Sequence, residues 1–363
     1  MNKFYDIFIN MTRNCNFRCV YCYEEGKYNH DYLSEKNAQK ILEFIKELKN
    51  SNFFIKEYSI IRLTFFGGEP LLNKKVLKYI VEETKNDDSI YYSLITNGSK
   101  IEDIIEIFDP IKNIKLRNIP KLHIQVSYDG YPINVKTRPS LDGKDTSHLV
   151  KDNIKKLFEY NYNTSIKSTI TPDNFKYLPD VYEDIKNIYP QGYGTYFPTI
   201  DYYNEYPMGY KIDDLNASMI KLAAKEASYF KKYHRFFFSW FENNNNKICS
   251  AGKDMIAIDT NLDVYPCHGA FFENSKDHLI GNLHDEDILN KINNHKNNLL
   301  IYAPETCQKC NTSICYKCNI IKYKYSKKNT YNERWNDHSN QPWLCNYYTS
   351  INKIKLALYK ILF

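Results

Sequence analysis

The sequence alternates between short β-rich runs and amphipathic helical segments over its first two hundred residues. The β-rich runs are residues 4–10, 60–66, 91–96, 122–127, 165–171 and 193–199. Helical patterns lie at residues 34–50, 73–86, 101–108, 147–160 and 177–188. This alternation predicts an α/β fold with a parallel sheet covered by helices. Six units are too few for a closed eight-stranded barrel, so the sheet is expected to be either an open partial barrel or a flat doubly wound sheet.

The second half of the chain has a different organisation. A long helix is expected over 213–236, the run "ENNNN" at 242–246 interrupts the pattern, and seven of the ten cysteines follow. Few long periodic segments accompany these cysteines, so metal is expected to hold that region together. The predicted units are a barrel at 1–212, a linker helix at 213–247, a small cysteine-rich domain at 248–350 and a C-terminal tail or helix at 351–363.

Charge and hydropathy exclude several classes of partner. The formal net charge is +6, and the basic residues are scattered over helices instead of forming the basic stripe of a nucleic-acid-binding protein. No apolar run is long enough for a membrane span, and the polar N-terminus does not suit a signal peptide. We therefore expect a cytoplasmic protein without nucleic-acid or membrane partners, in which ten cysteines indicate metal and not disulfides.

Three cysteines lie close together near the start of the chain. Cys15, Cys19 and Cys22 fall in the loop after the first predicted strand, at the sheet edge where active sites are built. Three thiolates can hold three irons of a 4Fe–4S cluster and leave the fourth iron without a protein ligand. The alternative is a structural zinc site completed by His30. The spacing and the position in the loop favour the cluster.

The cysteine loop resembles the signature of radical S-adenosylmethionine (SAM) enzymes, with Tyr21 as its aromatic residue. Three further motifs follow in the family's order, each at the end of a predicted strand: "FFGGEP" at 65–70, "TNG" at 96–98 and "VSYDG" at 126–130. Each alone would also suit an ordinary turn. By resemblance, the residues that bind SAM are Tyr21, Gly67, Gly68, Glu69, Pro70, Asn97, Ser127 and Asp129. Tyr21 would cover the adenine, unless it is simply a packed loop aromatic.

The resemblance implies a defined chemistry. The open iron of the cluster binds the amino and carboxylate groups of SAM, and an electron from the reduced cluster breaks SAM to a 5′-deoxyadenosyl radical. That radical abstracts a hydrogen atom from the substrate. The protein orients the radical and excludes competing reactions.

The later cysteines form a second constellation. Its members are Cys249, Cys267, Cys307, Cys310, Cys315, Cys318 and Cys345. The two C-x2-C pairs alone would suit a zinc ribbon. The whole set resembles the SPASM extension of radical SAM enzymes, which carries two auxiliary 4Fe–4S clusters. By resemblance, the outer cluster takes Cys307, Cys310, Cys315 and Cys345. The inner cluster takes Cys249, Cys267 and Cys318, so it is one ligand short, and a substrate donor, His268 or water could complete it.

The resemblance points to a peptide or protein substrate. Sulfatase maturases of this kind place an Asp after the cysteine equivalent to Cys267, where this chain has His268, a candidate base or a loop hydrogen-bonding residue. Other relatives crosslink, excise or epimerise residues of ribosomal peptides. All ten cysteines are assigned to clusters, which disfavours epimerisation by a spare cysteine. We expect peptide crosslinking or a related oxidation; formylglycine formation and a zinc-binding interaction module are the alternatives.

Two protein partners are expected beside the substrate. An electron donor such as flavodoxin or ferredoxin would reduce the clusters. The first strand begins almost at residue 1, so the peptide's leader is expected to be bound by a separate protein or by the barrel itself.

Overall fold

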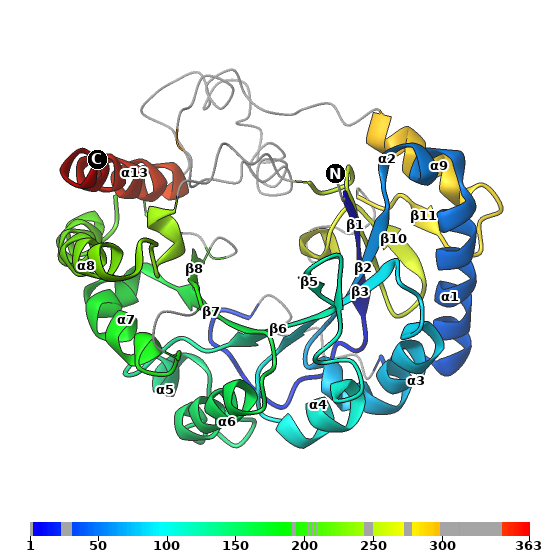
Figure 1. The fold of residues 1–363 in the computed structure, drawn as a ribbon, viewed down its shortest axis with the longest axis horizontal. Coiled ribbons are helices and arrows are strands. Elements are labelled where there is room, and N and C mark those ends of the chain that lie inside the picture. Colours follow the sequence, from blue (N-terminus) through cyan, green and yellow to red (C-terminus); the bar gives the residue numbers. More distant parts are fainter. Residues whose placement is uncertain are drawn as a thin grey trace.

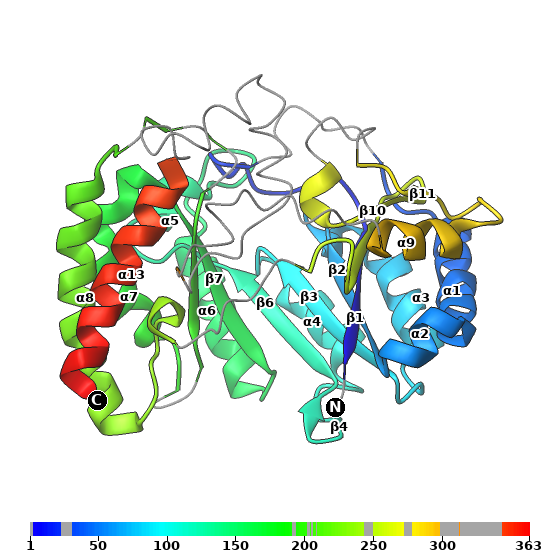
Figure 2. The ribbon, with the colours of Figure 1, turned by 90° about the horizontal axis from the view of Figure 1, so that it is seen from above.

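The computed structural model describes residues 3–22, 31–190, 194–201, 204, 206–207, 209–242, 250–271, 278–297, 312 and 343–363. Its strands form a curved sheet that lines the inside of an arc, and helices cover the outside (Figure 1). Over the described residues the sheet does not close into a ring, because β11 (Gly281–Asn282) and β8 (Tyr196–Ile200) form its two ends; Figure 1 shows the arc, and Figure 2 shows it from above. This arrangement is the predicted open partial barrel, and a flat doubly wound sheet, which has helices on both faces, is excluded.

Six parallel strands follow one another around the arc in chain order. They are β1 (Phe4–Asn10), β2 (Ile60–Phe66), β3 (Ile90–Thr96), β6 (Leu122–Ser127), β7 (Thr164–Ile170) and β8 (Tyr196–Ile200). The register pairs the last residue of β1, Asn10, with the last of β2, Phe66. The loops that follow the strands therefore meet at one edge of the sheet, as the sequence predicted for its four motifs.

The outer helices bury the apolar face that their sequence pattern predicts. They are α1 (Glu35–Asn50), α3 (Lys74–Thr84), α4 (Ile101–Phe108), α6 (Ser147–Glu159) and α7 (Leu178–Lys186). Ser34 caps α1 as predicted, because its side chain accepts a hydrogen bond from the Asn37 N–H. In α1 the buried side chains include Ala38, Ile41 and Ile45, which pack in the main core against the strands. Burial of this apolar surface is the main favourable contribution to folding.

The inner face of the barrel is partly polar. Along β6, Leu122, Ile124 and Val126 are buried, while the alternate residues His123, Gln125 and Ser127 are only partly buried. Alternation of this kind places successive side chains on opposite faces of the sheet. The partly buried polar side chains of β6 therefore face the barrel interior. At the end of the strand, Ser127 lines the cavity described below.

Part of the predicted cysteine-rich domain continues the barrel sheet. Strand β9 (Met255–Ile258) pairs parallel with β1, and β10 (Asp263–Tyr265) and β11 (Gly281–Asn282) extend the sheet in antiparallel fashion. Helix α9 (Ile288–Asn297) follows. These strands have two to four residues each. Runs so short carry no visible periodicity, which is why the sequence did not predict them.

Two long helices close the other end of the arc. Helix α8 (Ile212–Tyr233) agrees with the predicted helix at 213–236, and α13 (Trp343–Leu362) runs beside it (Figure 2). The expected terminal helix thus begins at Trp343, before residue 351, and includes Cys345. The ring of Tyr347 meets that of Phe175 edge-on, with their centroids 5.0 Å apart, which ties α13 to the barrel.

Several short elements join these parts. They are α2 (Asn52–Glu57), α5 (Asn134–Thr137), the hairpin of β4 (Lys115–Leu116) and β5 (Ile119–Pro120), and the 3-10 helices η1 (Pro70–Asn73), η2 (Pro172–Tyr177), η3 (Ser239–Phe241) and η4 (His268–Phe271).

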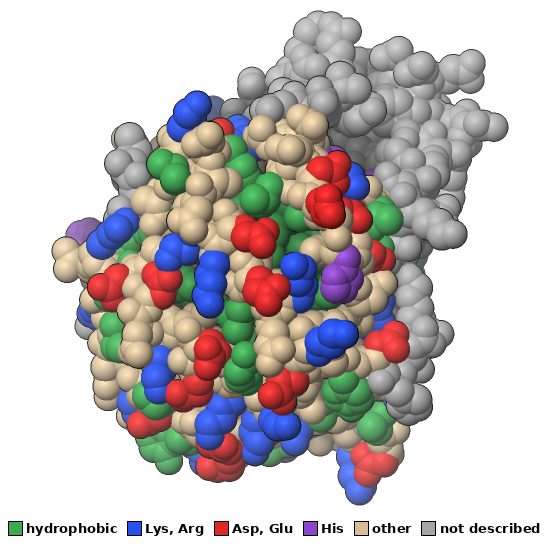
Figure 3. All heavy atoms as spheres, turned by 90° about the vertical axis from the view of Figure 1, so that its right-hand side faces the viewer, with side chains coloured by type: hydrophobic (Ala, Val, Ile, Leu, Met, Phe, Trp, Pro, Cys, Tyr) green, Lys and Arg blue, Asp and Glu red, His purple; other side chains and the backbone are tan. Residues whose placement is uncertain are grey.

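The outer surface is a mixture of charges. Figure 3 shows acidic and basic side chains interspersed over the face that includes α1, with hydrophobic side chains scattered among them. Neighbouring opposite charges pair along the helices, as Lys40 and Glu43 do on α1. This face bears no basic stripe, in agreement with the solvated helix faces predicted. Within the described residues, no helix combines the length and the apolar character that crossing a membrane requires.

A buried carboxylate joins α8 to the segment that follows it. Glu226 of α8 is fully buried and accepts hydrogen bonds from the Tyr182 hydroxyl (2.6 Å) and from the Phe237 N–H (3.0 Å). Burial raises the pKa of Glu226 to about 7, although these donors oppose the rise. The native state therefore holds this proton more tightly than the unfolded chain does.

The raised pKa of Glu226 predicts that the free energy of unfolding depends on pH. Between about pH 4.5 and about pH 7 the native state binds more protons than the unfolded state, so stability from this group falls as pH rises through that window. Glu226→Gln removes the titration. The free energy of unfolding of the wild type, minus that of the variant, should decrease across the window and stay level above it. Urea unfolding at a series of pH values measures this difference, and a constant or rising difference would contradict the prediction.

Candidate active site

A cavity lies at the carboxyl ends of the parallel strands, and the three N-terminal cysteines line it. Cys15, Cys19 and Cys22 stand in the loop after β1, where the Cys22 N–H donates to the Cys19 carbonyl (3.0 Å). Burial raises the pKa of the Cys15 thiol to about 12 and also raises the pKa of Cys19. These thiols are therefore neutral at pH 7 until a metal displaces their protons.

The donor set fits an iron–sulfur cluster. Among the described residues, no three His, Cys, Asp or Glu side chains gather closely enough to hold a single metal ion. In a 4Fe–4S cluster each thiolate binds its own iron, so the thiols need only face one shared space. The three cysteines do so, because all of them line the same cavity. His30, which the zinc alternative requires, lies outside the described residues.

The loop after β2 packs directly on the cysteine loop. The Gly68 N–H donates to the Thr12 carbonyl and the Glu69 N–H to the Asn14 carbonyl, both at 2.8 Å. A Cβ at Gly67 would lie 2.2 Å from the Thr12 carbonyl oxygen, and one at Gly68 2.2 Å from that of Asn14. Only glycine permits this approach of two backbones. Both glycines, which the sequence predicts to contact SAM, also line the cavity.

Glu69 lies behind the cavity wall. Its side chain is fully buried and accepts hydrogen bonds from the Asn97 N–H (2.7 Å), the Thr96 hydroxyl (2.9 Å) and the Leu71 N–H (3.2 Å). Burial raises the pKa of Glu69 to about 7. The carboxylate predicted to accept from SAM therefore ties its loop to the end of β3. Pro70, the first residue of η1, is buried beside it.

Two other predicted SAM contacts line the cavity from neighbouring strand ends. Asn97 follows β3, and its amide donates to the side chain of Asn16 (2.8 Å) and to the sulfur of Cys15 (3.7 Å). Ser127 ends β6. The "TNG" and "VSYDG" motifs are thus brought beside the cysteine loop, as the sequence predicted.

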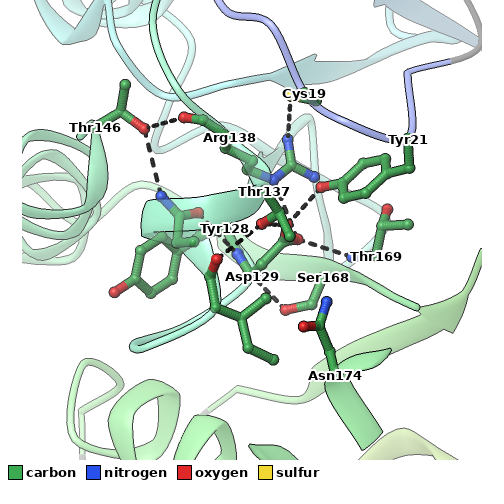
Figure 4. A network of polar contacts seen from close by, with 12 residues as sticks. Cys19, Tyr21, Tyr128, Asp129, Thr137, Arg138, Thr146, Ser168, Thr169 and Asn174 are labelled. Atoms are coloured by element: carbon green, nitrogen blue, oxygen red, sulfur yellow. Dashed lines mark hydrogen bonds and ion pairs between the residues drawn. The ribbon is translucent and has the colours of Figure 1, made fainter. Parts of the chain in front are cut away.

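Asp129 is the centre of a buried network (Figure 4). One carboxylate oxygen accepts from the hydroxyls of Tyr21 (2.5 Å) and Thr137 (2.6 Å), and the other accepts from the Thr169 N–H (2.9 Å). The Arg138 Nε lies 3.1 Å from the second oxygen. Asp129 is completely buried, so it supports the wall and does not itself face the cavity.

Tyr21 is fixed by the same network. Its hydroxyl is held by Asp129, and the Arg138 guanidinium lies 5.3 Å from its ring centroid. Burial raises the pKa of the Tyr21 hydroxyl well above its usual value, so the group remains a hydrogen-bond donor. The aromatic residue of the cysteine motif both packs in the loop and lines the cavity.

Arg138 and Lys167 also line the cavity, and the sequence analysis missed both. Lys167 stands on β7, two residues before Thr169, so both face the interior. Burial and the nearby Arg138 charge lower the pKa of Lys167 to about 8. The sequence did contain a signal for Lys167, because a lysine lies in the middle of the predicted strand 165–171 and lysine is rarely buried in a sheet covered by helices.

His268 lines the cavity from the side of β1. Its ring stacks on Phe8 (centroids 4.8 Å apart) and meets Phe66 edge-on (5.5 Å). Burial, with a smaller effect of the Lys167 charge, lowers the pKa of His268 to about 4, so the imidazole is neutral at pH 7. The preceding Cys267 is buried. The predicted catalytic candidate therefore reaches the same space as the three cysteines.

The other predicted auxiliary-cluster ligands are only partly placed. Cys345 stands in the first turn of α13. Those outside the described residues are Cys249, Cys307, Cys310, Cys315 and Cys318.

The contact between the two loops yields a prediction for Gly68→Ala. The added methyl group would overlap the Asn14 backbone, which cannot move aside as a flexible side chain can. We expect the free energy of unfolding to fall by roughly 1–3 kcal/mol, with less iron bound after anaerobic reconstitution. Gly143→Ala is the control, because its Cβ meets nothing within 4 Å, although its φ of +78° is itself unfavourable. Equal iron binding by the two variants would contradict the prediction.

Comparison with known proteins identifies the N-terminal half. Residues 9–185 match the model of the family described as the Radical SAM superfamily. An uncharacterised protein of Methanocaldococcus jannaschii is 29% identical over 177 residues, which are 48% of this chain and 56% of that protein. The radical SAM cyclopropyl synthase TigE of Paramaledivibacter caminithermalis is 24% identical over 336 residues, which are 86% of this chain and 65% of TigE. The chain thus spans less than two thirds of the length of both relatives.

Solved structures share the fold. The structure of anSMEcpe with bound AdoMet and Cp18Cys peptide matches with a TM-score of 0.69 at 17% identity, over 99% of both chains. Streptococcus suis SuiB bound to its precursor peptide SuiA matches with a TM-score of 0.57 at 15% identity, over 89% of this chain and 74% of SuiB. Residues 9–185 therefore match the Radical SAM superfamily, and the fold of the chain is shared with these solved structures.

Proposed function

We propose that this protein is a radical SAM enzyme and a peptide maturase, which abstracts a hydrogen atom from a residue of a ribosomal peptide and thereby forms a crosslink or another oxidative modification. The group held by Cys15, Cys19 and Cys22 supplies, when bound and reduced, the electron that cleaves SAM to a 5′-deoxyadenosyl radical. One observation carries the proposal: these three thiols face a cavity that the predicted SAM-binding glycines, Asn97 and Ser127 also line.

The residues of the chain prepare this cavity for a charged cofactor. Gly67 and Gly68 line the cavity and allow their loop to pack directly on the backbone of the cysteine loop. Asn97 and Ser127 offer side-chain donors and acceptors from the ends of β3 and β6. The buried Glu69 and Asp129 hold these walls in place, so the polar groups are oriented before SAM arrives.

The later cysteines are proposed to hold two auxiliary 4Fe–4S clusters in a SPASM-like region. Cys267 directly precedes His268, a residue of the cavity wall, which supports an inner cluster near the active site. Cys249 and Cys318 would complete its protein ligands. The outer cluster would take Cys307, Cys310, Cys315 and Cys345. With seven cysteines, the inner cluster retains one position for a substrate donor, His268 or water.

The peptide substrate is proposed from the relatives. TigE is named as a cyclopropyl synthase, and both anSMEcpe and SuiB were solved with peptides. His268 is the proposed proton acceptor, because its ring lines the cavity and its Nδ1 has no hydrogen-bond partner within the described residues. A flavodoxin or ferredoxin would deliver electrons, and a separate protein or the barrel would bind the peptide's leader.

Formylglycine formation is the second candidate. The fold matches anSMEcpe over 99% of both chains, more completely than it matches SuiB. In the sulfatase maturases that the sequence resembles, an Asp follows the cysteine equivalent to Cys267, and His268 stands there in this chain. An imidazole is also able to accept a proton, so His268 in place of that Asp is compatible with the reaction.

The central assignment is tested with Cys19→Ala. Loss of one of three thiolates should abolish formation of 5′-deoxyadenosine from SAM and dithionite under anaerobic conditions. Cys345→Ala is the matched control, because it removes a proposed ligand of the outer cluster and should lower iron content while SAM cleavage persists. Product is measured by chromatography, and iron, sulfide and zinc by elemental analysis. The radical SAM assignment would be wrong if Cys19→Ala cleaved SAM as the wild type does, and zinc without iron would favour the interaction module.

The reaction is tested by mass spectrometry of a peptide encoded beside the enzyme, after incubation with SAM and reductant. Loss of two hydrogens without an aldehyde indicates a crosslink or desaturation. A product that reacts with an aldehyde probe indicates formylglycine. The peptide proposal fails if SAM is cleaved but neither such peptides nor sulfatase-derived peptides change.

A further inference from the structure

A short segment runs antiparallel beside the cysteine loop and places one arginine opposite one cysteine. The backbone N–H groups on either side of Cys19 donate to the carbonyls on either side of Arg138. These pairs are Arg18 to Pro139 (2.8 Å) and Val20 to Thr137 (3.0 Å). A β-bridge between Phe17 and Ser140 continues the pairing. Cys19 and Arg138 are therefore held face to face by the backbone, before any side-chain contact is considered.

The Arg138 side chain completes the contact. Its Nη1 lies 3.7 Å from the Cys19 sulfur, within the range of an N–H···S hydrogen bond, and its Nε lies 3.1 Å from Asp129 (Figure 4). Arg138 is 7% exposed and Asp129 0%. Asp129 is itself fixed by Thr137 and Thr169, so the guanidinium has little freedom to turn away from the sulfur.

The sulfurs of Cys15 and Cys19 do not have equivalent surroundings. The Cys15 sulfur accepts from two neutral donors, the Phe17 N–H (3.4 Å) and the Asn97 amide (3.7 Å). The donor to the Cys19 sulfur carries a full positive charge. Charge-assisted hydrogen bonds are roughly twice as strong as neutral ones, and burial strengthens them further. Of these two sulfurs, that of Cys19 has the donor that better stabilises negative charge.

Reduction of an iron–sulfur cluster adds one electron and increases the negative charge on its sulfurs. Hydrogen bonds to the sulfurs and the net charge around them are among the factors that set the reduction potential. A buried cation beside one thiolate favours the reduced form over the oxidised form. Asp129 offsets part of the Arg138 charge at longer range, but it also keeps the N–H group directed at the sulfur.

We propose that Arg138, positioned by Asp129, raises the reduction potential of the cluster held by Cys15, Cys19 and Cys22 through its contact with the Cys19 sulfur. This inference rests on the cluster of the proposed function. The step is the transfer of one electron from a low-potential reductant, dithionite or a reduced flavodoxin or ferredoxin, to the oxidised cluster. No bond is made and no proton is required. Arg138 acts through the ligand sulfur and Asp129 acts through Arg138, so both are positioning residues for the electron transfer.

The test is an anaerobic redox titration of the reconstituted enzyme, followed by electron paramagnetic resonance without SAM. SAM added afterwards identifies the signal of the three-cysteine cluster, because that cluster alone is expected to bind it. Arg138→Gln should shift the midpoint potential to more negative values. Lys78→Gln is the control: it removes one positive charge from the outer face of α3, where Lys78 pairs with Glu106, and should leave the potential unchanged. Equal potentials for Arg138→Gln and Lys78→Gln would overturn the inference.

A second variant covers the case in which Arg138→Gln fails to load iron. Arg138→Lys keeps the charge but loses the forked group that reaches Asp129 and Cys19 together, so it should give a smaller shift in the same direction. If Arg138→Lys had the midpoint potential of the wild type at equal iron content, the role of the N–H···S contact would be overturned. Reduced SAM affinity with an unchanged potential would likewise overturn it and assign Arg138 to SAM binding. If the wild type shows no SAM-responsive signal, the proposed function fails as well, and that outcome is distinct from a present cluster with an unmoved potential.

Discussion

The close contact between the loops after β1 and β2 is the constraint on which the rest of the site depends. The cysteine loop contains little regular secondary structure, so its backbone groups need partners from elsewhere. Gly68 and Glu69 provide N–H donors to the carbonyls of Thr12 and Asn14, and the absence of a side chain at Gly68 allows this approach. The parallel register of β1 and β2 brings the two loops together. The cysteines are therefore oriented by a neighbouring backbone, before any metal is bound.

Buried carboxylates fix the other walls of the cavity in a similar way. Glu69 and Asp129 each accept three hydrogen bonds from side-chain or backbone donors, which offsets the cost of removing a carboxylate from water. Loss of either acid would leave several buried donors unpaired, a larger penalty than the loss of one surface contact. The acidic residues of the "GGEP" and "VSYDG" motifs thus have structural reasons to be acidic, apart from any contact with SAM.

The sequence predicted the barrel closely because apolar residues recur at clearly different spacings in its strands and in its helices. The bounds of β1, β2 and β6 coincide with the predicted runs, and the four motifs meet at one edge of the sheet. The sequence could not show which side chain of a motif faces the cavity, because that direction depends on the local backbone turns of each loop. Glu69 and Asp129 therefore proved to be buried, and Arg138, in an irregular segment after α5, carried no signal at all. The short strand β9 was invisible for lack of length.

The polar groups of the cavity differ in how far the protein itself satisfies them. On the side of the cysteine loop, Asn97 and Arg138 have protein partners. Two other groups of the cavity wall differ from these. The Lys167 ammonium makes no hydrogen bond or ion pair with the described residues, and the His268 Nδ1 is buried without a partner among them. A desolvated ammonium costs free energy, which a carboxylate within the same cavity would recover. Asn97 and Arg138 are therefore already held by protein partners, whereas Lys167 and His268 are polar groups that a ligand in the cavity could contact.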